Sequence, residues 1–284
     1  MTKLEWTGER MIADEGLGLG AAEHLHRYAV ALEITEGKTV LDIACGEGYG
    51  TNLIASNAKK VYGIDLEENV IAHAKQKYQD KKLEFLKGSI INIPLENNCI
   101  DVIICFETIE HVEQQNEAIK EFRRVLKEEG LLLISTPAKE NYQKLNFDNP
   151  FHLKELALEE FINICAKHFL HSKLYHQKYM EASFFYPDKT AIKNIAEYKG
   201  SFNEITKEDF KKTYHYNIIL CSNEKNISEL ETSFFGASRF NQAYNNSVLA
   251  RAVKKTINKY EKSYSYRIGK KIVQPFSFLK RFLK

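Results

Sequence analysis

Residues 40–50 read VLDIACGEGYG, and this stretch decides the fold class. Its first part is an apolar run, Val40, Leu41 and Ile43, which predicts a buried parallel strand. The run carries one acid, Asp42, and continues into three glycines at alternate positions, Gly46, Gly48 and Gly50. Glycines after a strand allow a sharp turn and a close approach of the backbone to a ligand. The following TNLIASNA (51–58) predicts a helix that begins at the same ligand.

A second apolar run, VYGID at 61–65, ends in the acid Asp65, 23 positions after Asp42. An acid at the end of the second strand of a βαβ unit can accept two hydrogen bonds from ribose hydroxyls. The acid inside the first strand would stabilise an ammonium group, whereas the anionic pyrophosphate of a dinucleotide gains nothing from it. Together the two acids favour S-adenosylmethionine. NAD or a flavin is the alternative, because glycine turns also occur in dinucleotide-binding folds.

VLDIACGEGYG and VYGID resemble the first two motifs of the class I S-adenosylmethionine-dependent methyltransferases, and the resemblance covers roughly residues 4–250. It implies a doubly wound α/β fold with a seven-stranded, mostly parallel sheet, an N-terminal cap helix and an inserted substrate cap. Further strands are expected at 83–90, 100–106, 131–136, 172–179 and 216–222. Helices are expected at 117–130 and 156–169, and at 23–34 with one face made of Leu25, Tyr28, Ala29 and Leu32.

We therefore predict three parts of the chain. Residues 1–34 form an N-terminal cap segment, and 35–250 form the methyltransferase domain, with 180–213 as the inserted substrate cap. Residues 251–284 form a basic C-terminal tail, with eleven Lys or Arg against one acid, a net charge of +10. Since the whole chain is +2, the remainder is −8.

Charge and composition limit the partners that we expect. The acidic body and the lack of an aromatic NPPY-like motif argue against a nucleic-acid partner. In 263–284, Lys and Arg alternate with large apolar residues, as in segments that lie at an anionic membrane surface. A solvated or dimer-packing tail is the alternative. The sequence carries no signal for the oligomeric state.

The chain has no apolar run of about 18 residues and no signal-peptide pattern at its N-terminus, so we expect neither a membrane span nor secretion. Its five cysteines lack CxxC spacing and are expected to be reduced core thiols. These features predict a cytoplasmic protein, with a peripheral contact at the inner membrane face through the tail.

The resemblance implies a cofactor site on many residues of the first half of the chain. The expected set is Arg10, Tyr28, Asp42, Ala44, Gly46, Gly48, Asp65, Leu66, Ser89, Ile90 and Phe106. Ser89 stands where many members of the family have an acid that contacts adenine, and an ordinary turn is the alternative there. For Arg10 and Tyr28, the alternative is a scaffold role.

FETIEH at 106–111 places Glu107, Glu110 and His111 at i, i+3 and i+4, on one face of a helical turn. Such a group can bind a divalent metal, act as an acid/base pair, or only order the cofactor loop. The pattern resembles that of ubiquinone-type O-methyltransferases, in which it is associated with a metal. Of these roles we favour a general base at His111 over a metal site.

His152, in NPFHLKEL (149–156), is the second base candidate, because its loop follows the fifth strand at the carboxyl edge of the sheet. A capping or core role is the alternative. The catalytic set is then His111, Glu107, Glu110 and His152.

The N-terminal TGERMIADEG (7–16) and the helix after it resemble a methyltransferase subgroup that lies among enzymes of bacterial surface polysaccharide synthesis. This resemblance implies an O-methyltransferase for a carbohydrate-type acceptor: a nucleotide sugar, a capsule or lipopolysaccharide sugar, or its phosphate substituent. The alternatives are O- or N-methylation of a small non-sugar metabolite, and a binding protein that holds the cofactor without turnover.

Overall fold

The computed structural model describes Leu4 and residues 11–13, 19–142, 149–180, 182–188, 196–200, 205–209 and 214–263. The chain divides into two compact units, Met1–Ala237 and Ser238–Lys284, so the second unit begins before the tail boundary predicted at residue 251. In the described part of the second unit the chain forms one helix, α7 (Ser238–Glu261). Arg10 and most of the predicted membrane-contact segment, 264–284, lie outside the described residues.

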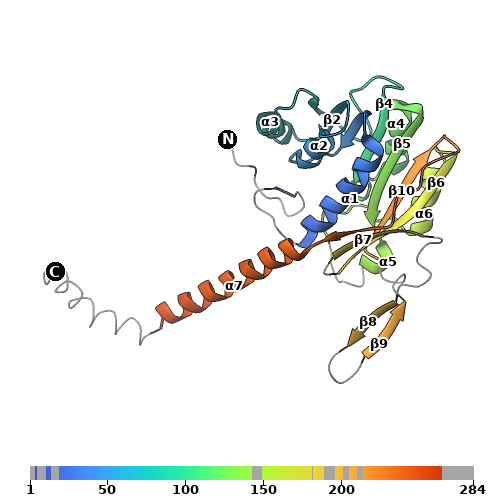
Figure 1. The fold of residues 1–284 in the computed structure, drawn as a ribbon. Coiled ribbons are helices and arrows are strands. Elements are labelled where there is room, and N and C mark those ends of the chain that lie inside the picture. Colours follow the sequence, from blue (N-terminus) through green and yellow to red (C-terminus); the bar gives the residue numbers. More distant parts are fainter. Residues whose placement is uncertain are drawn as a thin grey trace. The chain divides into compact units, whose positions relative to one another are not determined.

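The first unit is built on a nine-stranded sheet with the order β11-β7-β6-β10-β5-β4-β1-β2-β3 (Figure 1). The strands are β1 (Thr39–Ile43), β2 (Lys60–Asp65), β3 (Leu83–Lys87), β4 (Ile100–Phe106), β5 (Leu126–Pro137), β6 (His171–Tyr179), β7 (Ala182–Pro187), β10 (Tyr216–Ser222) and β11 (Ser233–Gly236). From β3 to β5, neighbouring strands pair in parallel, whereas β10, β6, β7 and β11 are joined by antiparallel pairing.

The helices of this unit are α1 (Leu19–Thr35), α2 (Tyr49–Ile54), α3 (Glu68–Lys77), α4 (Gln115–Val125), α5 (Lys139–Tyr142) and α6 (Leu158–Ala166), with a short 3-10 helix η1 (Ile109–His111). Among the described residues, no helix is both long enough and apolar enough to cross a bilayer.

Alternating side chains of the central strands fill two separate cores. Leu41 and Ile43 of β1 pack in a cluster that includes residues of α4 and α6, among them Phe122 and Phe161. Val40 packs on the opposite face, in a cluster with residues of α1 and α2. Because side chains alternate along a strand, Asp42 points to the same face of the sheet as Val40, the face covered by α1 and α2.

The sheet has nine strands, and the prediction of seven was wrong. β7 comes from the predicted substrate cap 180–213 and pairs along the edge of β6, and β11 pairs along β7. An unpaired edge of β6 would expose a row of backbone donors and acceptors, which β7 covers, and β11 in turn covers the outer edge of β7. In the described part of the cap, β8 (Ala196–Gly200) and β9 (Ile205–Asp209) form a separate two-stranded hairpin.

Two helix predictions also need correction. The predicted helix 117–130 ends at Val125, and the next residues belong to β5, whose register against β4 shifts between Ile100 and Val102. On α1, Ala29 is exposed, whereas His26 and Arg27 are buried. The reason is that α1 contacts α2, β4, β7 and β11, so polar residues that bond across these contacts are buried as well.

Candidate functional site

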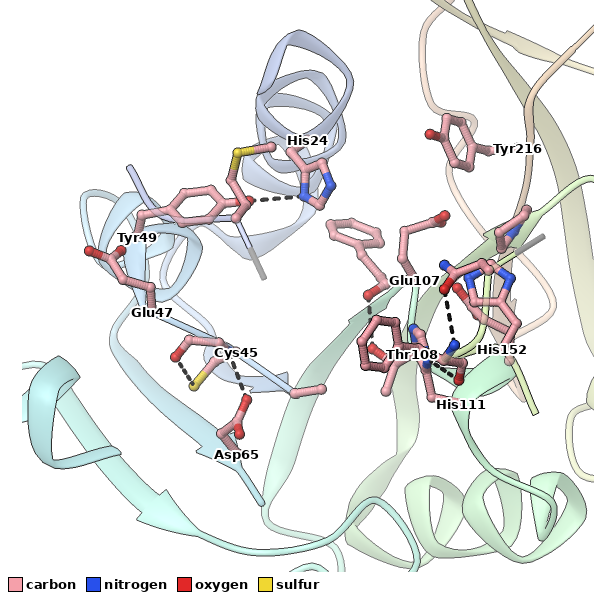
Figure 2. Close-up of a pocket in the computed structure, with 18 of the residues that line it drawn as sticks. His24, Cys45, Glu47, Tyr49, Asp65, Glu107, Thr108, His111, His152 and Tyr216 are labelled. Atoms are coloured by element: carbon pink, nitrogen blue, oxygen red, sulfur yellow. Dashed lines mark hydrogen bonds between the residues drawn. The ribbon is translucent and has the colours of Figure 1, made fainter. Parts of the chain in front are cut away.

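A pocket of about 540 Å³ opens at the edge of the sheet where β1, β2, β4 and β5 end (Figure 2). One half is lined from the ends of β1 and β2, by Ala44, Cys45, Gly46, Glu47, Tyr49, Asp65 and Glu67. The other half is lined from the ends of β4 and β5, the loop at 149–152 and the start of β10, by Glu107, Thr108, Glu110, His111, Pro137, Asn149, Phe151, His152 and Tyr216. The carboxyl edge of a doubly wound sheet is the usual place for ligands in such folds.

The turn after β1 has a left-handed backbone at several positions. Gly46 has φ 54° and Gly48 has φ 94°, and the non-glycine Ala44 has φ 57°. Such conformations cost free energy in non-glycine residues and are concentrated at functional sites. Of the three predicted glycines, Gly46 lines the pocket.

The other two glycines, Gly48 and Gly50, do not line the pocket and lie against packed side chains. A Cβ on Gly48 would lie 3.1 Å from both Ala74 Cβ and the Phe85 ring. A Cβ on Gly50 would overlap the ring of Tyr28 in α1. Gly50 thus lets α1 and α2 pack closely, which places Tyr28 at the pocket.

Asp65 is held in place at the end of β2. Its Oδ2 accepts a hydrogen bond from the Gly46 backbone N–H at 2.9 Å, and its Oδ1 accepts one from Glu67 N–H at 3.1 Å. A carboxylate has about four acceptor positions, so both oxygens can accept further bonds. Two oxygens fixed at the pocket wall fit the paired hydroxyls of a ribose.

Asp42 lies behind the pocket wall, only 2% exposed, and is not among the lining residues. It accepts hydrogen bonds from Tyr28 Oη at 3.2 Å and from Thr51 Oγ1 at 2.6 Å. Burial raises the pKa of Asp42 to about 7, although the hydrogen bonds from Thr51 and Tyr28 act in the opposite direction. Direct contact of Asp42 with a cofactor stays a prediction; in the structure Asp42 contacts Tyr28, which lines the pocket.

The remaining predicted cofactor residues divide in two. Ala44, Gly46, Tyr28, Asp65 and Phe106 line the pocket. Ser89, Ile90, Leu66 and Gly48 do not: Ser89 Oγ accepts a bond from Ile91 N–H at 3.3 Å, Ile90 is buried, and Leu66 is 67% exposed. For these four, contact with a cofactor stays a prediction.

His24 and Tyr49 line the pocket and were missed from the sequence. The Tyr49 hydroxyl oxygen lies 3.0 Å from His24 Nδ1. Burial, followed by the nearby Arg27 charge, lowers the pKa of His24 to about 3, so its ring is neutral. The spacing of four residues between His24 and Tyr28 on a predicted helix was a usable signal.

Glu107, directly after β4, has a left-handed backbone, with φ 49°. Its Oε1 accepts a hydrogen bond from Ser135 Oγ at 2.6 Å. Burial raises the pKa of Glu107, while the Arg27 guanidinium opposes that shift. Arg27 is itself buried, lies 4.6 Å above the Tyr216 ring and donates to Gln177 Oε1 at 2.7 Å.

Glu110 is fully buried in η1, at the pocket wall. Its Oε2 accepts a hydrogen bond from Thr136 Oγ1 at 3.0 Å, and its Oε1 has no hydrogen-bond partner among the described residues. Burial and the neighbouring Glu107 carboxylate raise its pKa well above the ordinary value.

The predicted helical face of Glu107, Glu110 and His111 does not form, because Glu107 precedes the 3-10 turn in a left-handed conformation. Instead, Glu110, His111 and His152 come together, with one donor atom of each within 4.8 Å of the others. The two imidazole rings are 5.1 Å apart, edge to face. His111 Nδ1 is 2.9 Å from the Phe151 carbonyl oxygen, and His152 Nδ1 is 3.0 Å from Glu155 Oε1.

This sheet order, with its acid-anchored glycine turn at the carboxyl edge, is that of an α/β protein with the Rossmann-like methyltransferase fold. Residues 41–134 match the family model described as a methyltransferase domain.

Named relatives agree with this class. A probable S-adenosylmethionine-dependent methyltransferase of Mycobacterium tuberculosis is 33% identical over 164 residues, 57% of this chain and 59% of that protein. One of Mycolicibacterium smegmatis is 33% identical over 168 residues, 57% of this chain and 63% of the relative. A ubiquinone biosynthesis O-methyltransferase of Glaesserella parasuis is 36% identical over 107 residues, 35% of this chain and 45% of that protein. The chain thus spans about three fifths of the length of the mycobacterial relatives.

Solved structures with the same fold include a SAM-dependent methyltransferase of Thermotoga maritima, with a TM-score of 0.52 and 17% identity over 72% of this chain and 92% of that one. The YcgJ protein of Bacillus subtilis has a TM-score of 0.51 and 15% identity, covering 71% of this chain and 100% of that one. At these identities the likeness concerns the fold alone.

Proposed function

We propose that this protein transfers the methyl group of S-adenosylmethionine to a hydroxyl oxygen of a carbohydrate-type acceptor. The observation that carries the proposal is the two-sided pocket, with a fixed acid beside a glycine turn on one side and a cluster of carboxylates and imidazoles on the other (Figure 2).

The β1–β2 half of the pocket is suited to the cofactor. Asp65, fixed by Gly46 and Glu67, presents oxygens for the ribose hydroxyls. Tyr28 and Phe106 also line the pocket, with their rings edge to face at 5.3 Å. The mycobacterial relatives, named S-adenosylmethionine-dependent, support the same cofactor.

The other half supports a polar acceptor. Glu107, Glu110, His111, His152 and Asn149 offer hydrogen-bond partners for several hydroxyl groups, and the rings of Phe151 and Tyr216 provide flat surfaces of the kind that pack on sugars. An apolar quinone ring would displace water from these polar groups without replacing its hydrogen bonds, which costs free energy.

The reaction needs little covalent chemistry from the protein. The acceptor oxygen attacks the methyl carbon, the carbon–sulfur bond breaks, and S-adenosylhomocysteine leaves as the neutral thioether. The acceptor proton passes to a base, for which His111 and its neighbour His152 are the candidates at the pocket wall. Positioning in line with the carbon–sulfur bond supplies the remainder of the acceleration.

Methylation of a small non-sugar metabolite is the second candidate, because relatives include ubiquinone and demethylmenaquinone methyltransferases. The deciding experiment incubates the protein with S-adenosylmethionine carrying a labelled methyl group and two acceptor panels, nucleotide sugars and demethylated quinols. Label in a nucleotide sugar supports the proposal. Label only in quinols, or in other small metabolites of a cell extract, would contradict the proposal and support the second candidate function.

A reaction without any acceptor or extract is the control, and the small amount of S-adenosylhomocysteine that it forms is the background. If an extract raises it no further, the protein binds the cofactor without turnover, and the enzyme proposal fails.

A further inference from the structure

The cluster of Glu110, His111 and His152 suits a metal ion better than the group marked by sequence spacing. Their ligand atoms lie within 4.8 Å of one another, and all three residues line the pocket. Figure 2 shows His111 and His152 side by side at the pocket wall. Glu107, the first residue of the sequence pattern, instead accepts a hydrogen bond from Ser135 and interacts with the Arg27 charge.

We propose that Glu110, His111 and His152 bind one divalent transition-metal ion, with His152 taking the place that sequence spacing assigns to Glu107. This inference does not depend on the proposed methyl transfer, because it concerns binding alone.

The first observation in its favour is the state of Glu110. Its side chain is fully buried at the pocket wall, and Oε1 has no hydrogen-bond partner among the described residues. A buried carboxylate oxygen without a partner is costly. A cation among these three side chains would remove that cost.

The second observation is the orientation of the two imidazoles. A carbonyl or carboxylate oxygen can only accept, so the Nδ1–H of His111 donates to Phe151 O and the Nδ1–H of His152 donates to Glu155. In the neutral rings the lone pair is then on Nε2. Ligating histidines in metal sites are held in this way, with the second ring nitrogen donating to a carbonyl or a carboxylate.

The third observation is how firmly the loop that carries His152 is attached to η1. The backbone N–H groups of Leu153 and Lys154 both donate to the Glu110 carbonyl oxygen at 3.0 Å. The Gln115 side chain donates to Ile109 O at 3.0 Å and to Lys154 O at 2.8 Å. The three donor groups are therefore brought together before any ion binds.

The donor set indicates the kind of metal. Two imidazole nitrogens and one carboxylate suit Zn²⁺ and the neighbouring first-row ions, whereas Mg²⁺ prefers oxygen ligands and keeps several waters. When bound, such an ion would occupy both Nε2 atoms, so that neither imidazole would take the acceptor proton, and it would supply a Lewis acid beside the acceptor half of the pocket.

Titration calorimetry of chelator-treated, untagged protein with Zn²⁺ tests the proposal, without cofactor or acceptor. The full chain should bind one equivalent, with at least tenfold preference over Mg²⁺. His152→Ala should weaken zinc binding by more than about 100-fold, and Glu155→Gln, which changes an outer partner, by about 10–100-fold. Glu117→Gln, at an exposed carboxyl of α4 that does not line the pocket, is the control and should bind as the wild type does.

X-ray absorption of the zinc-loaded wild type keeps the test independent of whether variants fold. The proposed set predicts scattering from two imidazoles, whereas Glu107, Glu110 and His111 would give one. The proposal is overturned by the absence of saturable zinc binding, by one imidazole, or by a His152→Ala protein that binds normally while Glu107→Gln does not.

Discussion

At the scale of single residues, Asp42 illustrates how burial changes the role of a side chain. Its carboxyl is enclosed by Tyr28 and Thr51, and its pKa rises from 3.8 to about 7. Between these two values the folded protein binds more protons than the unfolded chain. The free energy of unfolding should therefore fall as the pH rises from about 4 to about 7.

Asp42→Asn should remove this dependence, because an amide does not titrate in this range. The difference in unfolding free energy between wild type and variant should change by at most about 1.4 kcal/mol per pH unit over that window, and should level off above it. Urea unfolding of both proteins at several pH values measures this. Parallel curves would show that Asp42 is ionised throughout in the folded state.

His111 is the residue on which the proposed chemistry depends most. If it takes the acceptor proton or holds the group that does, His111→Ala should lose about 10²–10⁴ in turnover while binding the cofactor nearly as the wild type does. His168→Ala, at a ring that contacts Asn116, is the control and should keep its turnover. Steady-state rates with saturating cofactor measure both. Unchanged turnover in His111→Ala would leave His152 as the base.

The sequence was sufficient for residues whose role follows from their place in a local motif. Asp65, Gly46 and Ala44 lie where a strand–turn–helix pattern puts them, at the pocket. It was not sufficient for Glu155 and Ser135. Glu155 contacts His152, and Ser135 contacts Glu107, and only the folded chain defines these two contacts.

At the scale of elements, the contact of α1 with α2 depends on the absence of one side chain. Gly50→Ala would suit helix α2 by intrinsic propensity, yet its Cβ would overlap Tyr28. We expect a loss of about 1–3 kcal/mol in unfolding free energy, as for other overpacked sites.

Gly20→Ala is the matched control, since a Cβ there would lie 3.8 Å from Met11 Cε, an ordinary contact. It should be neutral or stabilise by up to about 1 kcal/mol. Thermal or urea unfolding distinguishes the two variants. A Gly50→Ala protein as stable as Gly20→Ala would show that Tyr28 moves aside without cost.

The parallel strands β1 to β5 could be predicted because each is a short apolar run between turn signals. The strand β11 could not, because its pairing with β7 joins residues far apart in the chain, Ser233 with Phe185. The strand β7, which pairs with the preceding β6, was assigned to the substrate cap instead. The end of α4 was misjudged for a related reason, since Leu126 pairs with Ile100 in the sheet instead of continuing the helix.

At the scale of the whole molecule, charge separates the chain into two parts. Residues 251–284 carry +10, and the rest carries −8. We predict that the full chain sediments with anionic vesicles, less so as salt is added, because exposed charges are screened. A chain that ends at Ala250 should stay in the supernatant and bind the cofactor as before.

Vesicles of neutral lipid are the control in the same sedimentation assay. Equal sedimentation of the full and the shortened chain would assign the membrane contact to another surface. A shortened chain that no longer binds the cofactor would give the tail a structural role.

The central claim is that the pocket binds S-adenosylmethionine through Asp65, and calorimetry tests it most directly. The wild type should bind S-adenosylmethionine and S-adenosylhomocysteine at one site. Asp65→Ala should lose about 1.5–3 kcal/mol for each charged hydrogen bond removed, at least tenfold in affinity. Glu84→Ala, which removes an equal charge from β3, should bind normally. Wild-type affinity in Asp65→Ala, or binding of NAD in place of S-adenosylmethionine, would contradict the account.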